Sequence, residues 1–136
     1  MRYWLMKSEP AVYPWERLVA EKQGHWDGVR NHQAAHHLRA MQLGDEAFFY
    51  HSNEGRAIVG IMRIIKTAYP DPTDAGGKFV MVDVQPVRAF IRPVTLASIK
   101  ITKALQGMQL LRQSRLSVSA VTAKEWGKIL ELEHAV

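Results

Sequence analysis

The sequence has no cysteine, no long apolar run and no acidic side chain between Asp83 and Glu125. Because thiols are absent, disulfides and thiolate metal sites are excluded, and nothing indicates an oxidising compartment. No stretch approaches the roughly 20 apolar residues of a membrane-spanning helix, and the N-terminal residues lack the apolar core of a signal peptide. We therefore expect a soluble, cytoplasmic protein without a membrane partner.

The basic side chains are unevenly distributed along a chain whose formal net charge is +5. The segment without acidic residues is rich in lysine and arginine, and an uncompensated cationic segment is typical of a surface that binds phosphates. A merely solubilising basic surface is the alternative. On the first interpretation, nucleic acid is the partner, and its backbone contacts Arg88, Arg92, Lys100, Lys103 and Arg112.

The 136 residues contain no repeat, low-complexity tract or linker, which predicts one domain over residues 1–136. Apolar stretches rich in branched and aromatic side chains predict strands at residues 2–7, 47–52, 57–68, 79–87 and 116–121. Helical spacing predicts helices at residues 14–23, 31–42 and 95–105, and Thr122 with Glu125 forms a capping box that opens a last helix. Central strands among helices predict an α+β fold, with a small mixed barrel that closes the sheet edges.

Six segments resemble the EVE family in order and spacing: residues 3–10 (YWLMKSEP), 26–31 (WDGVRN), 44–45 (GD), 50–53 (YHSN), 69–73 (YPDPT) and 115–118 (RLSV). The resemblance implies a PUA-like fold, which is a twisted mixed β-barrel of about five to six strands with helices across its openings. It also implies kinship with YTH domains, which hold a methylated adenine in an aromatic cage. From this kinship we expect a pocket for a modified base, such as a modified cytosine or adenine, in DNA or RNA.

A modified base can be recognised by stacking and by a few contacts to its edge. Stacking is worth roughly 1–3 kcal/mol per base and tolerates every base, so the edge contacts must supply selectivity. Trp26 is the candidate stacking platform, because we place it in a loop between two helices and beside Gly28, where the backbone can turn closely next to a ligand. The alternative for Trp26 is a core position, as we expect for Trp4 and Trp126.

Two motifs supply candidate polar contacts near the ends of the first strand and the first loop. Ser8 can donate or accept, Glu9 can accept from an exocyclic amine, and Lys7 is a candidate phosphate or pocket-wall cation. Arg30 is a candidate for contacting phosphate or stacking. Asn31 is expected to cap a helix whose free backbone N–H groups suit a base carbonyl or a phosphate.

Two further segments carry base-binding candidates. Alternation along a strand places Tyr50 and Ser52 on one face and His51 and Asn53 on the other, so we favour the first pair and keep the second as its competitor. In the segment without acidic residues, Arg115 is the best candidate for a phosphate or a base edge, and Ser117 lies beside it. Asp71, held between two prolines, is expected to anchor the N–H groups of another loop.

Metal and catalytic functions have weaker support. His32 and His36 have i, i+4 spacing with no third ligand at a suitable distance, so we expect neither a metal nor another cofactor. An enzyme acting on a nucleotide or nucleic acid, such as a hydrolase that uses Ser8 or Ser52 with His51 as base, is the principal alternative function. No catalytic motif supports it. A protein-interaction domain with a vestigial pocket is the third possibility.

Overall fold

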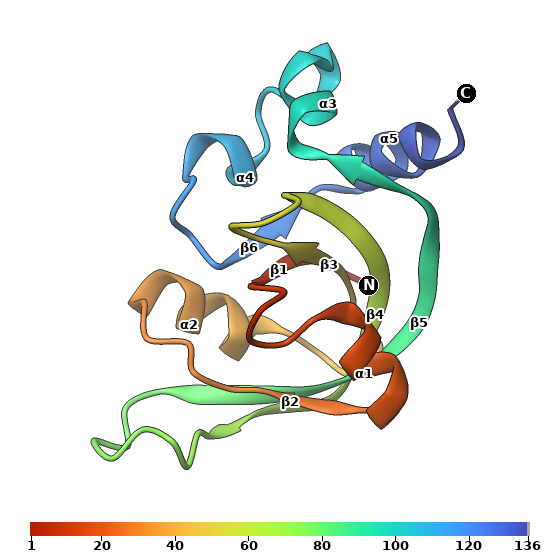
Figure 1. Cartoon of the computed structure of the whole chain (residues 1–136). Helices are drawn as coiled ribbons and strands as arrows, with labels where there is room; N and C mark the ends of the chain where they lie inside the picture. The colour runs from red at the N-terminus through yellow and green to blue at the C-terminus, as the bar shows by residue number, and fades with distance from the viewer. Residues whose placement is uncertain (136) are drawn as a thin grey trace.

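One mixed sheet organises the chain in a computed structural model that describes residues 1–135 (Figure 1). Its six strands lie in the order β2-β5-β4-β3-β1-β6. Strands β1 and β3 are parallel, and the other neighbouring pairs are antiparallel. The strands are β1 (Tyr3–Ser8), β2 (Gly24–Trp26), β3 (Glu46–His51), β4 (Ala57–Pro70), β5 (Val80–Thr95) and β6 (Val118–Val121).

The helices are short, and their caps follow the sequence. They are α1 (Trp15–Glu21), α2 (His32–Ala40), α3 (Leu96–Ile101), the 3-10 turn η1 (Lys103–Leu105), α4 (Gln109–Arg112) and α5 (Ala123–His134). The side chain of Asn31 accepts from the backbone N–H of Ala34, and Thr122 with Glu125 forms both bonds of the capping box, so both predicted caps are confirmed. The helix predicted over residues 95–105 is broken, because Thr102 leaves the helical region between α3 and η1.

The barrel predicted to close the sheet is not formed among the described residues. Strands β2 and β6 are the two edges of the sheet, and neither pairs with the other. Instead, β4 and β5 are long, interrupted by bulges, and curl around the molecule (Figure 1). On β6, the N–H of Ala120 donates to the side chain of Gln109 at 2.9 Å, so a side chain protects that edge in place of a neighbouring strand.

Two elements were missed by the sequence analysis, and one strand is longer than predicted. Strand β2 has three residues and exists through its pairing with β5, in which Trp26 lies opposite Val82. Helix α4 has four residues, which is too short for a helical repeat to show. Strand β5 continues past its predicted end at residue 87, because Pro86 lies where the register with β4 shifts and the strand accommodates it there.

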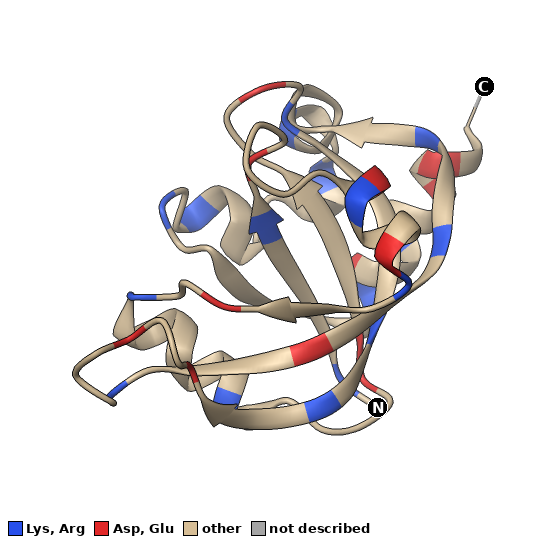
Figure 2. Ribbon diagram, turned by 60° about the horizontal axis from the view of Figure 1, so that its bottom comes forward, with Lys and Arg blue, Asp and Glu red and all other residues tan. Residues whose placement is uncertain are grey.

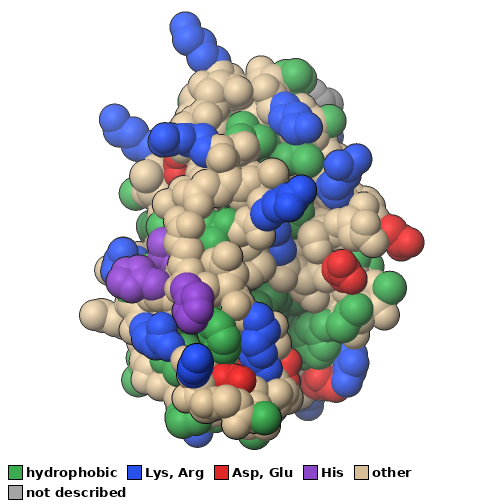
Figure 3. Space-filling view, turned by 90° about the vertical axis from the view of Figure 1, so that its left-hand side faces the viewer, with side chains coloured by type: hydrophobic (Ala, Val, Ile, Leu, Met, Phe, Trp, Pro, Cys, Tyr) green, Lys and Arg blue, Asp and Glu red, His purple; other side chains and the backbone are tan. Residues whose placement is uncertain are grey.

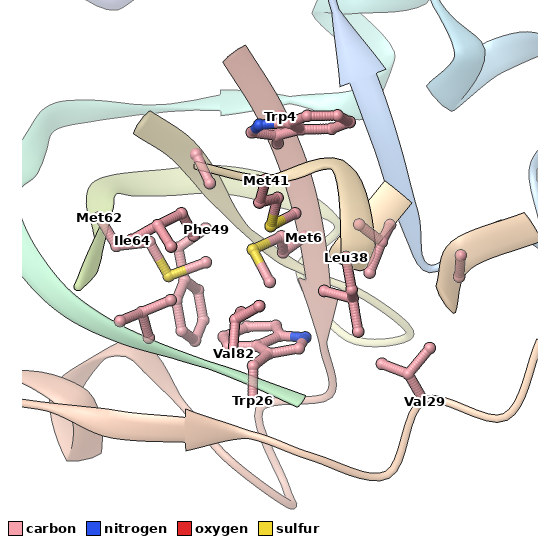
Figure 4. Close-up of a cluster of buried hydrophobic side chains, with 14 of the residues drawn as sticks. Trp4, Met6, Trp26, Val29, Leu38, Met41, Phe49, Met62, Ile64 and Val82 are labelled. Atoms are coloured by element: carbon pink, nitrogen blue, oxygen red, sulfur yellow. The ribbon is translucent and has the colours of Figure 1, made fainter. Parts of the chain in front are cut away.

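The sheet is buried on both faces. One hydrophobic cluster contains Trp4, Met6 and Phe49 (Figure 4), and the other contains Leu5 and Phe48, so neighbouring residues of one strand serve opposite cores. Trp4 and Trp126 are both buried, as predicted. Since both faces are covered, the functional groups of the sheet are left at the ends of its strands. No helix among residues 1–135 is long and apolar enough to cross a membrane.

Candidate nucleic-acid interface

The parallel pair β1 and β3 brings two predicted motifs together. Parallel strands end at the same edge of a sheet, and here Lys7 lies opposite Tyr50 while Ser8 lies opposite His51. The N–H of Ser52 donates to the carbonyl oxygen of Ser8 at 2.9 Å, which continues the pairing past the end of β3. Residues more than 40 positions apart in the sequence therefore form one polar edge.

Two hollows flank this edge, and Lys7 lines both. The first hollow has a volume of about 650 Å³ and lies between the end of β1, helix α1 and strand β2. Its walls include Lys7, Ser8, Tyr13, Arg17, Glu21, Gly24, His25, Trp26, Asp27 and Asp83. The second hollow, of about 450 Å³, is lined by Lys7, Glu9, Tyr50, Ser52, Asn53, Arg56, Arg115 and Ser117, among others.

Trp26 lies at the inner wall of the first hollow and is largely buried. It belongs to β2, so its predicted place in a loop between two helices was wrong, and only 7% of its surface is exposed. The indole packs edge-on against Phe49 at a centroid distance of 5.4 Å, among the side chains of the core (Figure 4). Trp26 thus combines the two positions considered for it, because it is a core residue whose surface still borders an open cavity.

Lys7 and Ser8 are both held by backbone carbonyls. The ammonium group of Lys7 donates to the carbonyl oxygen of Ser114 at 2.7 Å, and burial lowers the pKa of Lys7. The hydroxyl of Ser8 donates to the carbonyl oxygen of Tyr13 at 2.7 Å. Because that bond uses the only proton of the hydroxyl, Ser8 meets a ligand as an acceptor.

The side chains of residues 50–53 are divided between two environments. Tyr50, Ser52 and Asn53 line the second hollow, where Asn53 takes part from a turn at φ 68°. His51 points elsewhere, and its Nε2 accepts from the backbone N–H of Trp15 at 3.1 Å, at the start of α1. Burial lowers the pKa of His51, which favours the neutral ring that this bond requires. Ser8 and His51 thus have structural partners other than each other.

Arg30 and Asn31 lie outside both hollows and are held within the fold. Arg30 donates to Asp71 at 3.1 Å and to the hydroxyl of Thr73 at 2.8 Å, and Asn31 caps α2. The buried carboxylate of Asp71 also accepts from the N–H of Gly28 at 2.9 Å, so the predicted anchoring of another loop by Asp71 is confirmed. Burial alone raises the pKa of Asp71, but the hydrogen bonds outweigh it and lower the value to about 2.

The basic residues predicted to contact a nucleic-acid backbone are dispersed. Arg88 forms a bidentate pair with buried Glu133 at 2.6 and 2.9 Å, where β5 passes the C-terminal helix (Figure 2). Arg112 lines a third hollow of about 420 Å³, together with Arg2. The remaining three, Arg92, Lys100 and Lys103, are exposed on β5, α3 and η1. Lysine and arginine are spread over the whole face shown in Figure 3, whereas its acidic side chains gather mainly along the right and lower margins.

Several residues of the first hollow were not predicted. Tyr13, Arg17, Glu21, His25 and Asp83 reach it because α1 folds back over β1 and because β2 pairs with β5. No periodicity in the sequence indicates these long-range contacts. Among residues 1–135, no group of three or more metal-ligating side chains is suitably placed for a metal ion.

The fold and these two hollows define a small α+β domain with an open polar recess where two parallel strands end. The EVE domain family matches residues 2–132, and the chain belongs to this family, as its motifs predicted. Thymocyte nuclear protein 1 of Rattus norvegicus is 42% identical over 167 residues, an alignment that covers 98% of this chain and 74% of the relative.

Two solved structures are similar along nearly their whole length. The NMR structure of Rpa0253 from Rhodopseudomonas palustris has 52% identity and a TM-score of 0.92, covering 98% of this chain and 93% of that one. The human THYN1 protein, crystallised in complex with 5-methylcytosine-containing DNA, has 38% identity and a TM-score of 0.91, covering 100% and 99% of the two chains.

Proposed function

We propose that this protein binds nucleic acid and takes a modified base, such as a modified cytosine, into the first hollow. The observation that carries the proposal is the open recess of about 650 Å³ at the end of β1, bordered by Trp26 and by the motif residues Lys7 and Ser8. The complex of the related THYN1 protein with 5-methylcytosine-containing DNA supports it, since the two folds agree over the whole chain.

The polar groups of the first hollow suit the edge of a base. Asp27, Glu21 and Asp83 offer carboxylate oxygens, which accept from the exocyclic amines of cytosine and adenine. Ser8 adds a hydroxyl oxygen, and Lys7 a donor for a base carbonyl. A base in a duplex must leave the stack to reach such a recess, at a cost of a few kcal/mol, so single strands and weakened pairs are expected to bind best.

The second hollow suits the backbone on either side of that base. Its charged side chains are Lys7, Arg56 and Arg115 against a single carboxylate, Glu9. The first hollow, in contrast, has three carboxylates, which repel phosphate. We therefore place the base in the first hollow and a flanking phosphate in the second, with Lys7 between them.

Binding accounts for the polar residues better than hydrolysis does. A nucleophile needs a base within hydrogen-bond reach. The hydroxyl of Ser8 donates to Tyr13, and Nε2 of His51, the atom that would accept a proton, is occupied by the N–H of Trp15. Both residues act here as structural or ligand-binding groups.

Fluorescence anisotropy with labelled single-stranded oligonucleotides tests the proposal. Four oligonucleotides differ at one position, which carries 5-methylcytosine, cytosine, N6-methyladenine or an abasic site. We expect a modified base to bind more tightly than cytosine and the abasic strand to bind most weakly. Equal affinity for all four would refute base recognition, and no binding at low salt would refute nucleic-acid binding altogether.

A matched pair of variants assigns the base to the first hollow. Trp26→Phe reduces a side chain of 7% exposure at the hollow, and Trp126→Phe reduces one of 6% exposure that lies in the other core cluster. Both variants lose similar packing, so their thermal unfolding controls for stability. We expect only Trp26→Phe to weaken binding of the modified base; an equal effect of both variants would remove the base from this hollow.

A further inference from the structure

Trp26 exposes too little surface to stack fully with a base. A large aromatic side chain offers about 250 Å² at most, and 7% of that is about 18 Å². This is the area of a ring edge, whereas stacking requires a ring face. In the observed arrangement, another flat group must therefore carry most of the stacking in the first hollow.

Tyr13 is placed to do so. Its ring lines the same hollow, is only partly buried and stands at 85° to the indole of Trp26, with a centroid distance of 6.5 Å. The two rings thus form an aromatic corner. A base lying flat on one ring directs its edge at the other, which is a favourable arrangement of aromatic groups.

The position of the Tyr13 ring is fixed at both ends. At the backbone, its N–H donates to the carbonyl oxygen of Glu9 at 2.9 Å, and its own carbonyl accepts from Ser8 at 2.7 Å. At the other end, its hydroxyl donates to Glu21 at 3.0 Å, and Arg17 donates to the same carboxylate at 3.2 Å. Burial and the bond to Glu21 raise the pKa of Tyr13 to about 12, so the phenol keeps its proton.

The fold also leaves room for this ring. A Cβ atom added to Gly24 would lie 2.4 Å from the Tyr13 hydroxyl oxygen, so the missing side chain of Gly24 makes the space that the phenol occupies. A ring with a prepared position, an anchored hydroxyl and a free border on the cavity has the features of a preorganised binding surface.

From this geometry we infer that Tyr13 is the main stacking surface of the first hollow and that Trp26 forms its perpendicular end wall. The inference rests on the proposed binding of a base in this hollow and adds the residue that decides how tightly a flat ligand is held there. Glu21 and Arg17 are positioning residues, which act through the Tyr13 hydroxyl.

Two substitutions of Tyr13, measured with the same oligonucleotides, test the inference. Tyr13→Leu keeps an apolar side chain but removes the ring, and we expect at least tenfold weaker binding of the modified-base strand. Tyr13→Phe keeps the ring and loses the anchor, so we expect binding within about threefold of the wild type. The abasic strand should bind all three proteins equally, because it has no base to stack.

The outcomes separate the inference from the function on which it rests. A Tyr13→Leu protein that is folded by thermal unfolding and binds the modified base like the wild type overturns the inference. An equal loss for the modified and the abasic strand also overturns it, since that pattern indicates a structural role. If the wild type itself does not distinguish the modified from the abasic strand, the proposed function fails first.

Discussion

Substituting Asp71 by asparagine tests how the loop that carries Gly28 and Arg30 is held. The two carboxylate oxygens accept four hydrogen bonds. One oxygen accepts from the N–H and the hydroxyl of Thr73 at 2.8 and 2.6 Å, and the other accepts from the N–H of Gly28 at 2.9 Å and from Arg30 at 3.1 Å. Asp71→Asn replaces one oxygen with an amide NH₂, which then faces donors and has no acceptor among them.

The magnitude follows from the pKa of the carboxyl group, which falls from an ordinary 3.8 to about 2 in the fold. A shift of this size corresponds to about 2–3 kcal/mol of stability. Because the folded pKa is the lower one, this stability is present above pH 3.8 and is lost as the pH falls toward 2. We expect Asp71→Asn to lose about 3 kcal/mol at pH 7, since the unpaired NH₂ adds a small further cost.

Urea unfolding of the wild type and of Asp71→Asn between pH 7 and pH 3 measures this difference. We expect the gap between the two proteins to shrink by about half at pH 3, where much of the carboxylate contribution is lost. Glu54→Gln, which changes an exposed carboxyl group, is the control and should follow the wild type. A loss below about 0.5 kcal/mol at pH 7, or a gap independent of pH, would refute the reasoning.

Two further predictions concern packing and backbone binding. A Cβ on Gly60 would lie 2.6 Å from the Trp15 ring, so Gly60→Ala should cost about 1–3 kcal/mol in chemical denaturation, whereas Gly127→Ala, in open space on α5, should be neutral or stabilising. If a flanking phosphate lies in the second hollow, Arg56→Ala with Arg115→Ala should weaken binding to every strand and reduce the slope of log affinity against log salt by about 1.4 for single strands. Lys100→Ala with Lys103→Ala is the matched control, and an equal reduction there would place the backbone over α3 and η1 instead.

Much of the local structure could be predicted from the sequence. The side chains of Asn31 and Thr122 cap the helices that follow them, because a cap bonds to a backbone group only three residues away. Asp71, held by prolines on both sides, anchors a neighbouring loop as expected. The ordered motifs identified the EVE family, since each is a short string whose chemistry does not depend on distant residues.

The composition of the candidate site was decided only by the tertiary structure. Strand β2 forms because β5 pairs with it, and this pairing buries Trp26, which the sequence analysis had placed in a loop. Arg88 looked like a free cation until the fold brought buried Glu133, 45 positions along the chain, against it. The sequence alone determined the caps, the turns and the family, because these depend on neighbouring residues. The tertiary structure determined which side chains share a cavity, because such contacts join strands and helices that no local pattern relates.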